Sequence, residues 1–223
     1  MIYESIYMKF PQNQKENIVG LHFLYSLEFE ISYVQNLVKK FVWYLEQGYP
    51  SELILLPQGV TQHSTEEEVT QALQVEYDAA DYAACAASLQ EEWRDISGGF
   101  EKMCKEPVFR LGDEYSVVLT KYGTGGNYNV TMSRVTIRIN AQSSKKMAAT
   151  VVHEIIHMTI QYLIDQYRVR HWRKERLVDL LVERYFPGLK KMQMIKEDVS
   201  MVDSAFSESF PDIEAIVRSI RSS

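Results

Sequence analysis

Two histidines, His153 and His157, lie four positions apart, and Glu154 directly follows the first of them. On an α-helix, side chains at this spacing project from one face on successive turns, so both imidazoles can reach a single metal ion. Imidazole nitrogens are common zinc ligands, and a carboxylate next to them can act as a general base. This H-E-x-x-H pattern therefore predicts a zinc-binding helix on which Glu154 takes a proton from a zinc-activated water.

A catalytic zinc site requires a third protein ligand besides the two histidines. The extended pattern with another histidine six residues after the second is excluded, because Leu163 occupies that position. We expect the third ligand to be Glu175, eighteen residues after the second histidine, with His171 as the alternative. Asp179 lies one helical turn beyond Glu175, where its carboxylate can accept the second ring N–H of a ligating histidine and fix its tautomer.

Helical periodicity supports the two elements that must carry these residues. After the polar segment 140–144, apolar residues recur at three- and four-residue spacing, namely at Met147, Val151, Val152, Ile155, Ile156, Ile160, Leu163 and Ile164. This spacing predicts a helix with an apolar face. Two further helices are expected at about 172–185 and 212–220, separated by a break that contains Pro187 and Gly188.

Before the zinc-binding helix, the pattern has the two-residue period of β-strands. Segment 115–122 is rich in valine and tyrosine, and segment 130–139 alternates apolar and polar residues. The glycine-rich segment 123–127 separates them, so we expect a β-hairpin with a glycine-rich turn. A phosphate-binding loop is not expected, because the glycines precede a strand and no Gly-Lys-Ser/Thr follows.

The first half of the chain has mainly helical patterns. Segment 27–47 predicts one helix that ends at Gly48, and 65–96 predicts one long helix or two. Thr65 and Glu68 fit a capping box, and the apolar run 53–56 is a short strand or a buried turn. Because no shift in composition marks a boundary, residues 1–223 are expected to form a single α+β unit. We expect its helical part at about 1–106 and its catalytic part at about 107–223 to share a core.

Composition limits the partners and the location. The net charge of −6 argues against nucleic acid as a partner, and no apolar run approaches the length of a membrane span. Residues 1–17 lack the apolar run of a secretory leader, so a cytoplasmic protein is expected. Cys85 and Cys104 form no CxxC pair and are expected to be free thiols, with a single disulfide as the alternative.

The set His153, Glu154 and His157, followed by Glu175 and Asp179, resembles the gluzincin metallopeptidases of the thermolysin-like superfamily. The resemblance covers about residues 130–185 and is closer to the compact, minimal members than to thermolysin. It implies a mostly helical, zincin-like α+β fold in which a small antiparallel or mixed sheet packs on the active-site helix. It also implies that an edge strand, here expected at 130–140, binds extended substrate main chain to main chain.

The chain departs from this family in several places. The interval between the second histidine and the glutamate is shorter than in thermolysin, and Lys174 occupies the place of an asparagine. Larger members stabilise the oxyanion with a downstream histidine or tyrosine, for which the candidates here are Tyr167, His171 and Tyr185. The basic run 168–176 would favour acidic substrates if it borders the cleft.

These observations together predict a zinc-dependent peptidase that hydrolyses peptide or protein substrates. Glu154 would be the general base and then the general acid, and Asp179 would orient His153. One alternative is a regulatory or binding protein that keeps the metalloprotease scaffold without turnover. Another is a helical interaction protein without a metal.

Overall fold

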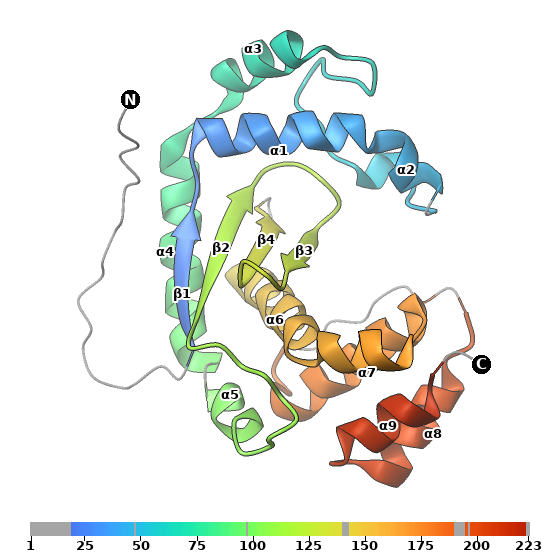
Figure 1. Ribbon diagram of the computed structural model, residues 1–223. Helices are drawn as coiled ribbons and strands as arrows, with labels where there is room; N and C mark the ends of the chain where they lie inside the picture. Colours follow the sequence, from blue (N-terminus) through green and yellow to red (C-terminus); the bar gives the residue numbers. More distant parts are fainter. Residues whose placement is uncertain are drawn as a thin grey trace.

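The computed structural model describes residues 19–46, 48–96, 98–139, 143–189, 195 and 197–221. This part of the chain has an α+β fold, as predicted, with a small mixed sheet surrounded by helices (Figure 1). The segment 1–17, on which the expectation about a secretory leader depends, lies outside the described residues.

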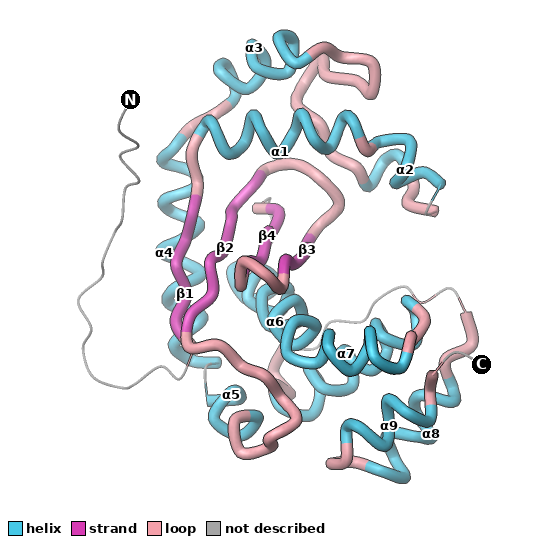
Figure 2. Tube along the Cα trace, viewed as in Figure 1, coloured by secondary structure: helices cyan, strands magenta, loops and turns pink. Residues whose placement is uncertain are grey.

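The sheet contains the strands β1 (Gly20–Leu24), β2 (Glu114–Thr120), β3 (Gly126–Asn129) and β4 (Arg134–Arg138). Their spatial order is β1-β2-β4-β3, with β1, β2 and β4 parallel and β3 antiparallel to β4 (Figure 2). Strand β4 is therefore an interior strand, and β3 lies at the edge of the described sheet.

The predicted hairpin between segments 115–122 and 130–139 is wrong. Ser116 pairs with Arg134 in a parallel register, so these two segments run in the same direction. The glycine-rich segment instead reverses the chain into β3, and the tight turn before β4 contains Ser133 with a φ of 46°. The edge strand was expected at 130–140, but β4 lies between β2 and β3, so the edge strand is β3. Asn140 lies outside the described residues. Period-two alternation identifies strands but does not set their direction.

Helix α6 (Ser144–Tyr167) is the central element of the fold. The side chain of Ser143 caps its first turn, and the left-handed backbone of Arg168 (φ 52°) ends it. The helix packs against α4 (Ala79–Ile96), β3, β4 and α7 (His171–Tyr185), and α4 and α6 lie behind the sheet in Figure 1. Because its neighbours cover it on several sides, its faces are buried almost throughout, including the positions of the two histidines.

Three further helices lie in the lower part of the molecule and pack on α6, on α7 or on each other (Figure 1). They are α5 (Gly98–Met103), α8 (Ser200–Ser209) and α9 (Ile213–Ser219). Helices α7 and α9 confirm the elements predicted at 172–185 and 212–220, whereas α5, α8 and β1 were not predicted. Phe100 of α5 packs edge-on against Phe186 at the end of α7, with 4.7 Å between ring centroids.

The N-terminal helices form the upper part of the molecule. They are α1 (Leu27–Lys39), α2 (Phe41–Glu46), a 3-10 helix (Ser51–Leu53) and α3 (Glu66–Glu76). The helix predicted over 27–47 is divided at Lys40, and the segment 65–96 forms two helices, α3 and α4. The capping box of Thr65 and Glu68 is confirmed. Leu55 forms a single antiparallel bridge with Gly123, which attaches this part to the glycine-rich segment.

The buried hydrophobic residues of the described chain form two clusters. The larger one combines β1, α4 and α5 with the sheet, α6, α7 and the last two helices. The smaller one joins α1, α3 and the segment around Ile54 to Tyr122. Residues on both sides of position 106 therefore contribute to the larger core.

A buried carboxylate connects α1 to the rest of the structure. Glu30, 2% exposed, accepts hydrogen bonds from the Tyr82 hydroxyl of α4 and from the backbone N–H of Lys121 after β2. Burial raises the pKa of Glu30 above its usual value, although the hydrogen bonds oppose that shift.

None of the described helices is long and apolar enough to cross a membrane.

Two adjacent glycines of α5 test the packing that supports α7. A Cβ atom on Gly99 would overlap the ring of Phe186, whereas one on Gly98 would meet nothing within 4 Å. We expect Gly99→Ala to lower the free energy of unfolding by about 1–3 kcal/mol, because the ring must move. Gly98→Ala should leave it unchanged or slightly higher, and urea denaturation measures both. Equal effects of the two substitutions would contradict this packing.

Candidate metal centre

The two histidines of α6 face each other in the interior. The side chains of His153 and His157 are 1% and 2% exposed, and their Nε2 atoms lie 3.0 Å apart. The spacing of four residues therefore has the predicted consequence, since one turn of helix brings both rings to the same point.

Glu175 of α7 completes a three-residue group. Its Oε2 atom lies 3.2 Å from each of the two histidine Nε2 atoms, and all three residues are buried. For zinc bonds of about 2.0–2.1 Å in a tetrahedral array, ligand atoms lie about 3.3 Å apart. The observed separations match one face of such a tetrahedron, so the three residues fit a metal ion.

The charge states of these residues favour a cation. Burial lowers the pKa of His157 to about 3, so its imidazole is neutral and needs to lose no proton to bind a metal. Burial alone would raise the pKa of Glu175, but its close polar contacts with His153 and His157 and the positive charge of Lys174 hold that pKa well below its usual value. Two imidazoles and one carboxylate are a donor set that zinc accepts.

Asp179 has the position expected of a supporting carboxylate. It is buried one turn beyond Glu175 on α7, and its Oδ1 atom lies 3.4 Å from His153 Nδ1. A proton on Nδ1 leaves the lone pair of Nε2 directed at the centre. The arrangement therefore supports the role proposed for Asp179 in orienting this ring.

Glu154, which follows His153 on α6, lies against the edge strand β3. It is 6% exposed, and a Cβ atom on Gly126 of β3 would lie only 2.6 Å from Glu154 Oε1 and from the Thr150 methyl group. Only a glycine lets the strand backbone come this close to the carboxylate. The glycine-rich segment thus sets the position of the candidate general base, a role that the hairpin interpretation did not include.

The second oxygen of Glu175 faces basic side chains. Lys174 Nζ lies 3.4 Å and His171 Nδ1 lies 3.6 Å from Glu175 Oε1. His171 is 52% exposed and is not part of the group that converges on the metal position. The structure therefore groups Glu175, and not His171, with the two histidines.

Tyr128 is a residue of the site that sequence analysis missed. Its ring stacks on His157 with 5.1 Å between centroids and an interplanar angle of 12°. Its hydroxyl donates a hydrogen bond to Gln161 Oε1 at 2.6 Å and lies 3.3 Å from Lys174 Nζ. Only its position two residues after Gly126, on the same strand face, could have indicated it.

Tyr49 is a second missed residue and comes from the N-terminal half. Partial burial and then the negative charge of Glu175 raise its pKa, Lys174 opposes that shift, and Glu154 adds to it. The phenol is therefore close enough to sense all three charges, and it is protonated at neutral pH. The sequence carried no signal for it, since about 100 residues separate Tyr49 from Glu154.

Two candidates for oxyanion stabilisation are not brought to the centre. The Tyr167 hydroxyl donates a hydrogen bond to Glu214 of α9. Tyr185 packs edge-on against Phe109 in the larger core. It follows Glu175 by ten residues on the same helix, a rise of about 15 Å.

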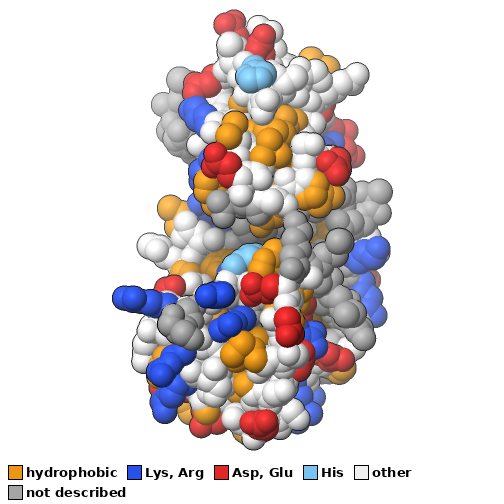
Figure 3. Space-filling model, turned by 90° about the vertical axis from the view of Figure 1, so that its right-hand side faces the viewer, with side chains coloured by type: hydrophobic (Ala, Val, Ile, Leu, Met, Phe, Trp, Pro, Cys, Tyr) orange, Lys and Arg blue, Asp and Glu red, His pale blue; other side chains and the backbone are white. Residues whose placement is uncertain are grey.

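One face of the molecule has side chains of several kinds. In Figure 3 the upper part has hydrophobic side chains, and histidine, acidic and basic side chains lie next to one another near the waist. The exposed hydrophobic residues of segment 42–55 are Val42, Trp43, Leu45, Tyr49, Leu53 and Leu55.

Comparisons with protein-family models, curated proteins and solved structures gave no match. The evidence for a function therefore comes from the geometry of the site.

Removal of Glu175 tests the ligand set. We expect Glu175→Ala to lower zinc affinity by more than about 100-fold, because even the loss of a supporting residue costs about 10–100-fold. Glu183→Ala, which removes an exposed carboxylate from the same helix, is the control and should bind zinc as the wild type does. Zinc titration against a competing chelator measures both. Unchanged affinity in Glu175→Ala would refute the assignment of the third ligand.

Proposed function

We propose that the protein is a zinc-dependent peptidase of gluzincin type. The observation that supports this most is the convergence of His153, His157 and Glu175 within 3.2 Å of one another, with Glu154 buried beside them. A buried group of two imidazoles and a carboxylate is costly unless its polar atoms have partners, and a metal ion would provide a shared one.

In the proposed reaction, the residues of the site have different roles. Zinc held by the group would polarise the substrate carbonyl and make a water molecule more acidic. Glu154 takes the proton of the attacking water and passes it to the leaving amine. Asp179 keeps the His153 ring in the tautomer that presents Nε2 to the centre.

The substrate is proposed to be an extended peptide. Strand β3 is the edge of the described sheet, runs along α6 and contains the glycine that touches Glu154. A peptide that adds to this edge would pair main chain to main chain and pass the carboxylate of Glu154.

The free thiols of Cys85 and Cys104 suit a reducing compartment, so the cytoplasm is the proposed location.

The alternative function is a binding or regulatory protein that keeps the scaffold without turnover. The close approach of Gly126 to Glu154 favours catalysis, because a purely structural metal site does not need a buried carboxylate outside the ligand group.

Substitution of the general base separates these functions. We expect Glu154→Gln, which keeps the size of the side chain, to retain zinc and to lower kcat by at least about 100-fold. The measurement is cleavage of a proteome-derived peptide library, read by mass spectrometry as new termini, with metal analysis of the same samples. A zinc-loaded wild type that yields no new termini would support the non-catalytic alternative.

The phenol of Tyr49 provides a second test. A protonated phenol beside the centre can donate a hydrogen bond to the developing oxyanion, so Tyr49→Phe should lower kcat by at least about tenfold and leave zinc content unchanged. Tyr167→Phe removes a hydroxyl that is bonded to Glu214 instead, and its kcat should stay within about twofold of the wild type. If both variants have wild-type kcat, Tyr49 has no such role.

A further inference from the structure

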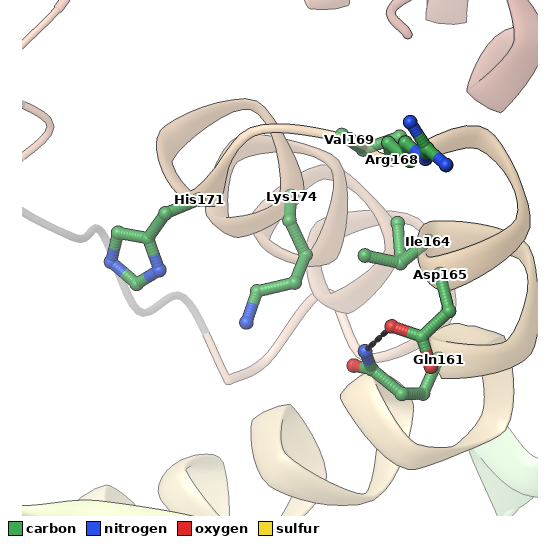
Figure 4. A pocket seen from close by; sticks show the side chains of 7 residues that line it. All are labelled: Gln161, Ile164, Asp165, Arg168, Val169, His171 and Lys174. Atoms are coloured by element: carbon green, nitrogen blue, oxygen red, sulfur yellow. Dashed lines mark hydrogen bonds between the residues drawn. The ribbon is translucent and has the colours of Figure 1, made fainter. Parts of the chain in front are cut away.

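A surface pocket borders the candidate metal centre. It lies where α6 passes into α7, and Figure 4 shows Lys174 and His171 on one side and Gln161 with Asp165 on the other. Arg168, in the left-handed position that ends α6, also lines it. The pocket therefore combines part of the basic run 168–176 with the end of the zinc-binding helix.

Lys174 connects this pocket to the metal centre. Its side chain is 15% exposed, and its ammonium group lies 3.4 Å from Glu175 Oε1 and 3.3 Å from the Tyr128 hydroxyl. These contacts hold the ammonium group between the pocket and the carboxylate that faces both histidines. A ligand group in the pocket would consequently lie next to the candidate metal centre.

The charges around the pocket favour an anion. Lys174 and Arg168 bring two positive charges, and His171 adds an imidazole. Asp165 brings one negative charge, and its Oδ1 accepts a hydrogen bond from Gln161 at 2.7 Å. A divalent cation beside Glu175 Oε2 would offset the charge of that carboxylate, which leaves the Lys174 ammonium as excess positive charge at the border of the pocket.

We propose that this pocket binds a carboxylate of the substrate adjacent to the scissile bond, with Lys174 as the residue that determines this specificity. The proposal rests on the peptidase function proposed above. The carboxylate can come from an acidic side chain or from the free C-terminus of the peptide, since both present the same planar anion.

Cleavage of defined peptides distinguishes the two sources. One set carries Glu or Gln at each position near the cleaved bond, and the other carries a free or an amidated C-terminus. We expect kcat/KM to be at least about tenfold higher for the peptide with the carboxylate, because a hydrogen bond to a charged group is stronger than one to a neutral group. Preference in the first set assigns the side chain, and preference in the second set assigns the C-terminus. No preference in either set would overturn the proposal.

The variants attribute this preference to the pocket. We expect Lys174→Met to reduce it to less than about threefold, Lys174→Arg to keep most of it, and Arg168→Asn, which suits the left-handed backbone, to weaken it. Lys102→Met removes an exposed charge on α5, which packs at the other end of α7, and should leave the preference unchanged. An unchanged preference in Lys174→Met would also overturn the proposal.

A binding experiment separates failure of the pocket from failure of the peptidase function. Zinc-loaded Glu154→Gln protein is titrated with glutarate, with the neutral glutaramide and with acetohydroxamate, which binds zinc alone. Lys174→Met in this background should weaken glutarate at least about tenfold and leave acetohydroxamate unchanged. Glutarate binding that depends on Lys174, together with zinc-loaded wild-type protein that cleaves no peptide, would keep the pocket and reject the peptidase. Glutarate binding that does not exceed that of glutaramide would reject the pocket.

Discussion

The packing of α7 on α6 is the constraint on which the candidate site depends. His153 and His157 belong to one helix and keep their spacing by helix geometry alone, whereas Glu175 reaches them only if the second helix lies at the correct distance and rotation. A shift of about 1 Å would take its oxygen outside the range of a shared metal bond. The apolar residues of α7 that fix this distance are themselves buried, so core packing and ligand geometry have the same origin.

Contacts on both oxygens of Glu175 further limit the position of its carboxylate. One oxygen faces the two imidazoles, and the other faces Lys174 and His171. A carboxylate with partners on both oxygens has little freedom to rotate, which favours a preformed site over one that assembles around its ligand. Stacking of Tyr128 on His157 limits the second ring in a similar way.

The sequence predicted the parts of the site that depend on local geometry. The helix, its two histidines, the neighbouring glutamate and the supporting Asp179 all follow from spacing along α6 and α7. Strand direction did not follow, because alternation is the same in parallel and antiparallel pairs. Tyr49 and Tyr128 were missed and Tyr185 was misplaced because each position depends on contacts between distant segments. The larger core combines residues from both halves of the chain.

The arrangement of the larger core has a consequence for dissecting the protein. A fragment that starts near residue 107 would contain every candidate metal ligand and the general base. It would nevertheless lack β1, which pairs with β2, and α4, which packs on α6. The tyrosine of α1 that packs on Gly123, three residues before the glycine that touches Glu154, would be absent as well. The second half of the chain thus contains the candidate site residues but not all the elements that hold them in place. Expressed alone, that half would expose hydrophobic core residues to water.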